Sequence, residues 1–424
     1  LERDEHAYVD YVTVVATKTI IISAEDFSPI TVEVLQNGTI RWLGEHLQLI
    51  TQAKPIPPIP VKAIRVNQTI NGVDQEVPFQ VEDWASDYHV PLGLTNNASI
   101  FSSRNMLVFL VNPKVSKITI WWNGSDKVTQ TPYAYVNRYF NDQPPTESNP
   151  IGTLRNGRVT LTIDASGTSF LVKSRINTIE TIANFMRAND EWSIYGSDPA
   201  YAIYNGVVRD IVHAEAEWSG GIPDCTNVYS HIVITLPANT TYYTYQLRLI
   251  FLESTNNPRT IKDLCPIQIS TSSSGSFSAL TENGTLGLYP MVSTTSGLFY
   301  NMSGVWQHHW TQINSSITRG FGIMFTDTAN KLLYYFDDKE EYKTSGKQTG
   351  ALNVIATSRT IELLPVAKSL NAPVSSENTL DIMWCGAVVT FDDTYPIYIN
   401  RGGSVSGLWV FVEHPPVITV TAES

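Results

Sequence analysis

The chain has 424 residues, with 28 Lys and Arg against 40 Asp and Glu, a formal net charge of -12 and 42% hydrophobic residues. This length and apolar content predict a folded protein with one large or several ordinary cores, and exclude a disordered chain. Because the chain is acidic and has no basic run, it cannot release counterions from a phosphate backbone, so we expect no nucleic-acid partner.

The polar surface is built mainly from Thr, Ser, Asn and Tyr, since charged residues make up only 16% of the chain. This usage is well below the average for charged residues and is typical of extracellular β-proteins. No apolar run approaches the roughly 18 residues that a membrane-spanning helix needs. The chain begins at Leu1 rather than Met, as a processed product would. We therefore expect an extracellular, cell-surface location and no transmembrane segment.

The first long element is the segment from Tyr8 to Ile22, which reads as a β-strand two to three times the usual length, apolar on both faces. A strand of this kind is expected to be buried on both sides. It either inserts into its own sandwich or completes the sheet of a neighbouring copy, as in strand-complemented pili. The residues expected to make these contacts are Tyr8, Val9, Tyr11, Val12, Val14, Val15, Ile20, Ile21 and Ile22.

Runs with period-2 alternation, rich in Val, Ile, Thr and Tyr and separated by Asn-Gly, Asp or Pro turns, continue along the chain. They predict an all-β fold with two consecutive antiparallel β-sandwiches of jelly-roll type. The polar, proline-containing stretch 141–150 reads as the linker between them. The expected division is an N-terminal strand arm at 1–26, a smaller sandwich at 27–150 and a larger one at 151–424.

One short helix is expected in "INTIETIANFMRAND", residues 176–190. Asn177 can cap it with Glu180 three residues later. An apolar face would be formed by Ile179, Ile182, Ala183 and Met186. We expect this helix to close the core of a sandwich.

The three cysteines are Cys225, Cys265 and Cys385. Cys225 and Cys265 lie in turn-like contexts at the two ends of a strand-rich segment, so we predict a disulfide between them in an oxidising compartment. Cys385 lies in an apolar strand pattern and is expected to be a buried thiol. There is no Cys-x-x-Cys pair for a thiolate zinc site.

Eight Asn-x-Ser/Thr motifs make N-linked glycans an expected partner. Several are Asn-Gly dipeptides, which also favour two-residue hairpin turns, so those motifs have a structural explanation as well. The candidate acceptors are Asn37, Asn67, Asn97, Asn123, Asn239, Asn283, Asn301 and Asn314.

The sharpest candidate for chemistry is "RDIVHAEAEW", residues 209–218. On a strand, His213, Glu215 and Glu217 would share one face and offer three potential ligands or an acid pair. The arrangement resembles the closely spaced carboxylates of some jelly-roll glycosidases, in which one acid attacks and its neighbour protonates the leaving oxygen. The simpler interpretation is a half-buried strand with one wetted face. No metal site is assigned from the sequence.

A second candidate site is "GVWQHHWTQ", where Trp306, His308 and Trp310 would share a face on a strand. Such a face could stack on sugar rings, although large aromatics two residues apart also suit a core. The acidic turns at 334–342 and 391–396 make calcium a possible ligand, but neither has a defined loop spacing. No other cofactor is expected.

The strands "VPFQVEDWASDYHVPLGL" and "SKITIWWNGSDKVTQTPYAYVNRYF", with few Lys and many Thr, Asn and Tyr, resemble secreted archaeal cell-surface glycoproteins: S-layer, pilus or filament subunits. The resemblance implies a non-enzymatic structural glycoprotein that assembles with copies of itself, and the long first strand makes strand donation the expected route. The alternatives are a secreted carbohydrate-active enzyme or sugar-binding module, and a glycosylated virion coat protein.

Overall fold

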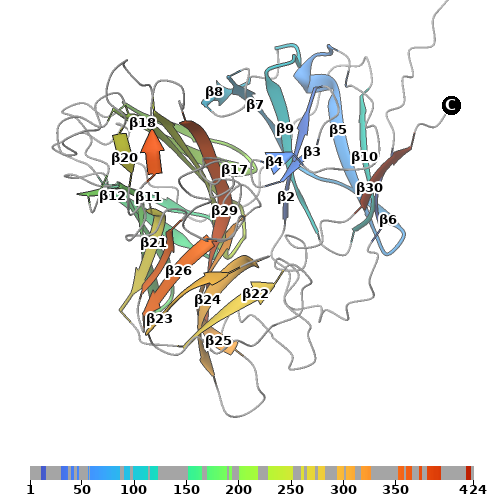
Figure 1. Ribbon diagram of the computed structural model, residues 1–424. Coiled ribbons are helices and arrows are strands. Elements are labelled where there is room, and N and C mark those ends of the chain that lie inside the picture. The colour runs from blue at the N-terminus through green and yellow to red at the C-terminus, as the bar shows by residue number, and fades with distance from the viewer. Residues whose placement is uncertain are drawn as a thin grey trace, which may run out of the picture.

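The computed structural model confirms the all-β class (Figure 1). Apart from turns and a single 3-10 turn, Val61–Ala63 (η1), regular structure in the described part of the chain is β-strand. In the described part of the chain, no helix is long and apolar enough to span a bilayer. The structure describes residues 11–15, 30–36, 40–42, 45–46, 56, 58–85, 90–95, 99–112, 115–122, 151–164, 170–188, 191–192, 200–217, 228–251, 259–261, 265–272, 276–281, 294–299, 302–310, 317–325, 352–357, 360–364, 372–374, 380–392 and 417–421.

Two antiparallel sheets are built mainly from the first third of the chain. Sheet I has the order β30 (Val417–Thr421), β1 (Tyr11–Val15), β10 (Val115–Trp122), β5 (Ile64–Ile70) and β6 (Val73–Glu76). Sheet II has the order β4 (Glu45–His46), β3 (Ile40–Trp42), β2 (Ile30–Leu35), β9 (Asn105–Val111), β7 (Phe79–Trp84) and β8 (Pro91–Leu94).

Two larger antiparallel sheets follow, and a separate pair is formed by β20 (Arg259–Ile261) and β28 (Ala372–Val374). Sheet III has the order β16 (Ala200–Asn205), β17 (Arg209–Glu217), β18 (Val228–Pro237), β19 (Tyr242–Phe251), β29 (Leu380–Phe391), β25 (Ile317–Phe325), β24 (Met302–Trp310) and β22 (Ser276–Thr281). Sheet IV has the order β11 (Ile151–Arg155), β12 (Thr160–Asp164), β13 (Phe170–Ile176), β14 (Ile179–Ala188), β21 (Cys265–Thr271), β27 (Thr360–Leu364), β26 (Leu352–Thr357) and β23 (Thr294–Phe299), with β15 (Glu191–Trp192) paired to β14.

Sheet II is covered on both faces, which explains why all seven residues of β9 are buried. Alternate residues of a strand point to opposite faces. Accordingly, Leu107 and Phe109 belong to one core with Ile118 of sheet I, while Met106 and Val108 belong to a second core with residues of sheet III. A continuous apolar run is what such double burial requires.

Sheet III is covered on its other face by sheet IV. The ring centroids of Tyr245 in β19 and Phe185 in β14 are 6.3 Å apart, and the hydroxyls of Ser174 in β13 and Thr390 in β29 are 3.0 Å apart. The four sheets therefore stack in the order I, II, III, IV, and each shares a buried contact with the next.

The predicted helix at 176–190 is wrong, because this segment forms a β-hairpin between β13 and β14. Asn177 has a φ of 47° and begins the two-residue turn, with Ile176 and Ile179 paired across it. Burial then follows a period of two: Ile179, Thr181, Ala183 and Phe185 are buried, whereas Ile182 is only half-buried. The i, i+3, i+4 spacing of apolar residues was coincidental.

The N-terminal strand lies in its own chain's sheet, between β10 and β30. In Figure 1 the C-terminal strand β30, in dark red, accordingly joins the blue strands of sheet I. Strands β2 to β10 lie in sheets I and II, and the segment from residue 151 onward supplies sheets III and IV together with β30. The domain boundaries at residues 26 and 150 stay predictions.

Candidate functional site

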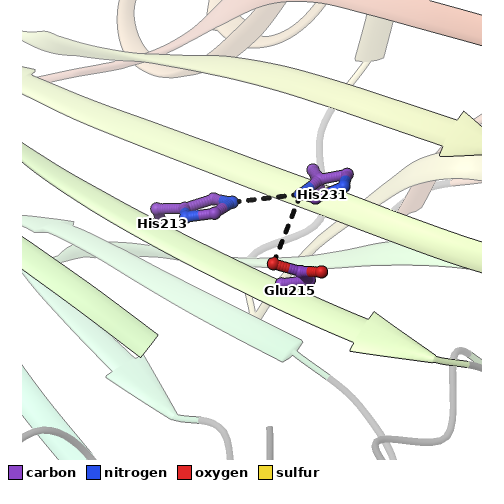
Figure 2. A group of neighbouring side chains, drawn as sticks. All are labelled: His213, Glu215 and His231. Atoms are coloured by element: carbon purple, nitrogen blue, oxygen red, sulfur yellow. Dashed lines mark hydrogen bonds and ion pairs between the residues drawn. The ribbon is translucent and has the colours of Figure 1, made fainter. Parts of the chain in front are cut away.

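The structure brings two of the three predicted strand residues, His213 and Glu215, together with a third side chain from the neighbouring strand. β17 carries His213 and Glu215, and β18 carries His231, which is the register partner of Glu215. Glu217 also lies in β17, opposite Tyr229. Figure 2 shows that the His213, Glu215 and His231 side chains converge on one face of sheet III.

The ligand atoms of His213, Glu215 and His231 all lie within 4.8 Å of one another. His213 Nε2 is 3.2 Å from His231 Nδ1, and the two rings are nearly parallel, 8° apart. Glu215 Oε2 is 4.0 Å from His231 Nδ1. The cluster could therefore hold a cation or an N–H···N hydrogen bond between imidazoles.

The three side chains differ in burial. His213 is 7% exposed, the His231 side chain is 11% exposed and that of Glu215 is 46% exposed. Burial, and secondly the charge of His231, lower the pKa of His213 to about 4. His213 is thus a neutral imidazole at neutral pH, with one unprotonated ring nitrogen.

His231 was not identified from the sequence. Its role depends on the register between β17 and β18, and a single sequence does not fix that register when the connection is not a two-residue turn.

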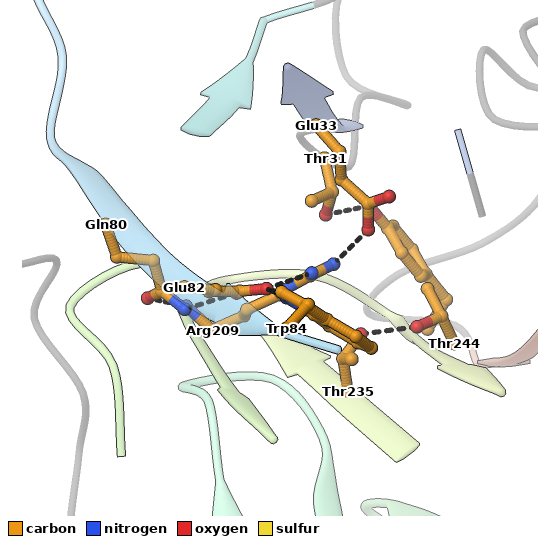
Figure 3. Close-up of polar contacts among 9 residues, drawn as sticks. Thr31, Glu33, Gln80, Glu82, Trp84, Arg209, Thr235 and Thr244 are labelled. Carbon is orange, nitrogen blue, oxygen red and sulfur yellow. Dashed lines mark hydrogen bonds and ion pairs between the residues drawn. The ribbon is translucent and has the colours of Figure 1, made fainter. Parts of the chain in front are cut away.

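A second polar cluster, also missed, joins sheets II and III (Figure 3). Arg209 of β17 is 2% exposed and binds Glu82 of β7 with two hydrogen bonds, from Nε to Oε1 and from Nη2 to Oε2, both 2.7 Å. Its Nη1 donates to Glu33 of β2 at 2.6 Å. Burial alone would lower the pKa of Arg209, but the charges of Glu82 and Glu33 and their hydrogen bonds outweigh it and raise that pKa above its usual range.

The Glu82 carboxylate is fully enclosed by donors. Oε1 also accepts from Gln80 Nε2 at 2.7 Å, and Oε2 accepts from Trp84 Nε1 at 2.9 Å. Gln80 Oε1 in turn accepts from the backbone N–H groups of Val208 and Arg209 at 2.9 and 3.0 Å. Because each carboxylate oxygen receives two donors, this cluster fixes how sheet III docks on sheet II, and we assign it a structural role.

Of the aromatic sugar-binding candidates, Trp306, His308 and Trp310 all lie in β24, as predicted. Trp306 pairs with Gly322, and His308 with Gly320. The register shifts between His309 and Trp310. Simple alternation therefore does not extend to Trp310, and the shared aromatic face stays a prediction.

Only part of the predicted assembly strand is described: Tyr11, Val12, Val14 and Val15 form β1. Tyr8, Val9, Ile20, Ile21 and Ile22 lie outside the described residues.

Two of the eight candidate glycan acceptors are described. Asn67 is half-buried in β5, and Asn239 is half-buried in the turn between β18 and β19 with a φ of 54°. The turn conformation agrees with the structural explanation for an asparagine there. Glycosylation itself stays a prediction, and the remaining acceptors lie outside the described residues: Asn37, Asn97, Asn123, Asn283, Asn301 and Asn314.

The predicted disulfide also stays a prediction, because Cys225 lies outside the described residues. Cys265 begins β21, is buried, and directs its Sγ to the carbonyl oxygen of Ile267 at 3.3 Å. Cys385 is buried in β29, in the strand setting that its sequence context predicted.

The calcium turns fall mostly outside the described residues. Of residues 391–396, Phe391 and Asp392 are described. Asp392 is 5% exposed and its Oδ2 accepts a hydrogen bond from Asn177 Nδ2 at 2.6 Å. This carboxylate helps to anchor the β13–β14 turn.

Comparisons with known proteins do not place the chain in a family. No protein-family model and no curated protein matches its sequence. A glycosyl hydrolase family 38 protein from Enterococcus faecalis superposes with a TM-score of 0.39 and 8% identity, over 98% of this chain and 48% of that one. An α-mannosidase from Enterococcus faecalis V583 gives the same TM-score and identity, over 98% of this chain and 46% of that one. The chain spans less than half the length of either, and so low a TM-score establishes neither a shared fold nor a shared activity.

Proposed function

We propose that this chain is an extracellular structural glycoprotein that assembles with copies of itself into a filament or surface layer by exchanging a terminal strand. One observation carries the proposal: the strands from the two ends of the chain meet at one edge of sheet I. β1 is registered to β30 over five residue pairs, from Tyr11–Thr421 to Val15–Val417. It is registered to β10 over only two, Tyr11–Thr119 and Val12–Ile118.

A terminal strand held by few registered pairs is suited to exchange. When β1 of a second copy takes the same place, the same main-chain hydrogen bonds and side-chain contacts form again, so the net change in free energy is small. Exchange from each copy to the next, without closure into a ring, generates an open filament. The strand that closes its own sheet in the single chain would then link neighbours in the assembly.

The stacking of the four sheets supports a structural role. Sheets II and III share the apolar core around Val108 and Ile211 as well as the buried Arg209 cluster. The Arg209–Glu82 pair, in which both carboxylate oxygens accept two hydrogen bonds, fixes the docking geometry closely. A subunit built in this way keeps its shape when its ends are held by neighbours.

Composition supports the exterior location and the glycans. Charged residues make up 16% of the chain, and the eight Asn-x-Ser/Thr motifs are potential acceptors for N-linked glycans on an extracellular chain.

Deleting residues 1–22 tests the assembly. We expect the purified full chain to form oligomers, measured by light scattering after size exclusion, and the deleted chain to form none. A chain with the same 22 residues in scrambled order is the control, because it keeps the length and composition of the segment. A full chain that stays monomeric at high concentration, or oligomers that survive the deletion, would contradict the proposal.

A further inference from the structure

We infer that His213, Glu215 and His231 form a binding site for a divalent transition-metal ion of the Zn²⁺ class, at the solvent-facing end of the contact between sheets II and III. The inference is independent of strand exchange, since β17 and β18 lie in sheet III and β1 lies in sheet I.

The two imidazoles already have the spacing that such an ion needs. A tetrahedral Zn²⁺ holds nitrogens at about 2.0–2.1 Å, which places two of them about 3.4 Å apart. His213 Nε2 and His231 Nδ1 are 3.2 Å apart. Both residues lie on strands with a neighbour on each side in an eight-stranded sheet, so the pair is preorganised.

The carboxylate can complete the site with a small movement. Two ligand atoms of a tetrahedral Zn²⁺ lie about 3.4 Å apart, and Glu215 Oε2 is 4.0 Å from His231 Nδ1. The separations within the cluster reach no more than 4.8 Å, so the Glu215 carboxylate must move inward by about 1.4 Å or less to reach the tetrahedral spacing. The Glu215 side chain is 46% exposed, which gives the ion a route from solvent.

The donor set selects the metal class. Two imidazole nitrogens and one carboxylate suit Zn²⁺, Ni²⁺ or Cu²⁺, whereas Ca²⁺ and Mg²⁺ require oxygen ligands. Three protein ligands leave a fourth position for water or for a group from a bound molecule.

Arg248 is the charged neighbour that opposes binding. It is half-buried and is the register partner of His231 on β19, so its guanidinium repels a cation unless the side chain turns away. The competing account of the cluster is an N–H···N hydrogen bond between the two imidazoles with no ion.

Calorimetric titration of the chelator-treated full chain with Zn²⁺ alone tests the site. We expect one tight equivalent, with binding weakened at least about tenfold by His231→Ala or by Glu215→Gln. Ca²⁺ should not compete. Co²⁺ in place of Zn²⁺ should give visible absorption bands of a four- or five-coordinate ion, and His231→Ala should abolish them.

Two further variants separate loss of the metal site from loss of the fold. Glu215→His, at an exposed position, should raise the affinity for Zn²⁺ because it supplies a third imidazole. The matched control is His308→Ala with His309→Ala, which removes the other adjacent histidine pair and should leave the tight equivalent unchanged. No Zn²⁺ binding by the parent chain would overturn the inference. Tight binding that survives His231→Ala and Glu215→Gln, or that is lost only in the control, would also overturn it.

Discussion

Replacing Glu82 with glutamine preserves the shape of the side chain and removes one charge from the cluster that joins sheets II and III. The wild-type carboxylate accepts four hydrogen bonds: two from Arg209, one from Gln80 and one from Trp84. A glutamine amide presents an NH₂ group in place of one oxygen, so two of these donors then face another donor. Glu82 is 0% exposed, so solvent water does not directly reach the donors left without an acceptor.

The expected loss follows from those unsatisfied donors. Each buried polar group left without a partner costs about 1–3 kcal/mol, so Glu82→Gln should lower the free energy of unfolding by about 3–5 kcal/mol. Glu33→Gln should cost only about 1 kcal/mol, because its amide oxygen can still accept from Arg209 Nη1 and the neutral Arg209–Glu82 pair remains. Arg209→Met should cost at least as much as Glu82→Gln, because it leaves two carboxylates buried without their cation.

Urea unfolding followed by far-ultraviolet circular dichroism measures these differences, provided that the m-values of the variants agree. Glu76→Gln is the control: the Glu76 side chain is 50% exposed and its Oε1 lies 3.9 Å from Arg65 Nε, too far for a hydrogen bond, so the change should alter stability by less than about 0.5 kcal/mol. Equal losses for Glu82→Gln and Glu33→Gln would refute the assignment of Glu82 as the enclosed member of the pair.

Three other outcomes follow from buried contacts. Gly206→Ala should destabilise the chain by about 1–3 kcal/mol, because a Cβ at this position collides with Gln80 Oε1 and with the carbonyl oxygen of Arg209. Thermal unfolding measures the loss, and an unchanged midpoint would show that the site has room for a methyl group. Asn156→Ala should cost about 2–4 kcal/mol, because the Asn156 side chain donates to the carbonyl oxygens of Pro237 and Thr240 and accepts from the backbone of Val159. Asn156→Asp keeps the acceptor but turns a buried carboxylate oxygen toward those two carbonyl oxygens, so it should be no more stable than Asn156→Ala in the same urea assay. The free energy of unfolding should fall by up to about 3 kcal/mol as the pH drops from about 6.5 to about 4. In this range His213 takes up a proton in the unfolded chain, whereas the folded imidazole, with its lowered pKa, does not. An identical pH dependence in His213→Gln would assign the effect to other groups.

The all-β class could be predicted because its signals are local. Period-2 alternation and turn residues identified β17, β24 and β29 as strands from the residues themselves. The hairpin at Asn177 could have been predicted in the same way, since asparagine tolerates positive φ and the flanking isoleucines alternate. The same short segment also has apolar residues at helical spacing, so its sequence fits either a helix or a hairpin. The alternating burial of its residues in the structure identifies the hairpin.

The contacts between sheets could not be predicted in the same way. Arg209 meets Glu33 and Glu82 across 176 and 127 residues of sequence, and no local pattern encodes that meeting. The continuous apolar run of β9 did carry a signal for burial on both faces, but it does not say which sheets provide the cover. The partner of β1 depends likewise on a strand from the opposite end of the chain.

A disulfide engineered between paired residues of β1 and β10 tests whether β1 crosses between copies. Tyr11 and Thr119 are paired across β1 and β10, at a distance that a disulfide can span. One chain carrying Tyr11→Cys is assembled with another carrying Thr119→Cys, and the oxidised mixture is resolved on a non-reducing gel, with each single variant alone as the control for the native cysteines. We expect a covalent dimer whose linking peptide, identified by mass spectrometry, joins position 11 of one chain to position 119 of the other. No such dimer, together with efficient closure within one chain of the double variant, would show that each copy keeps its own first strand.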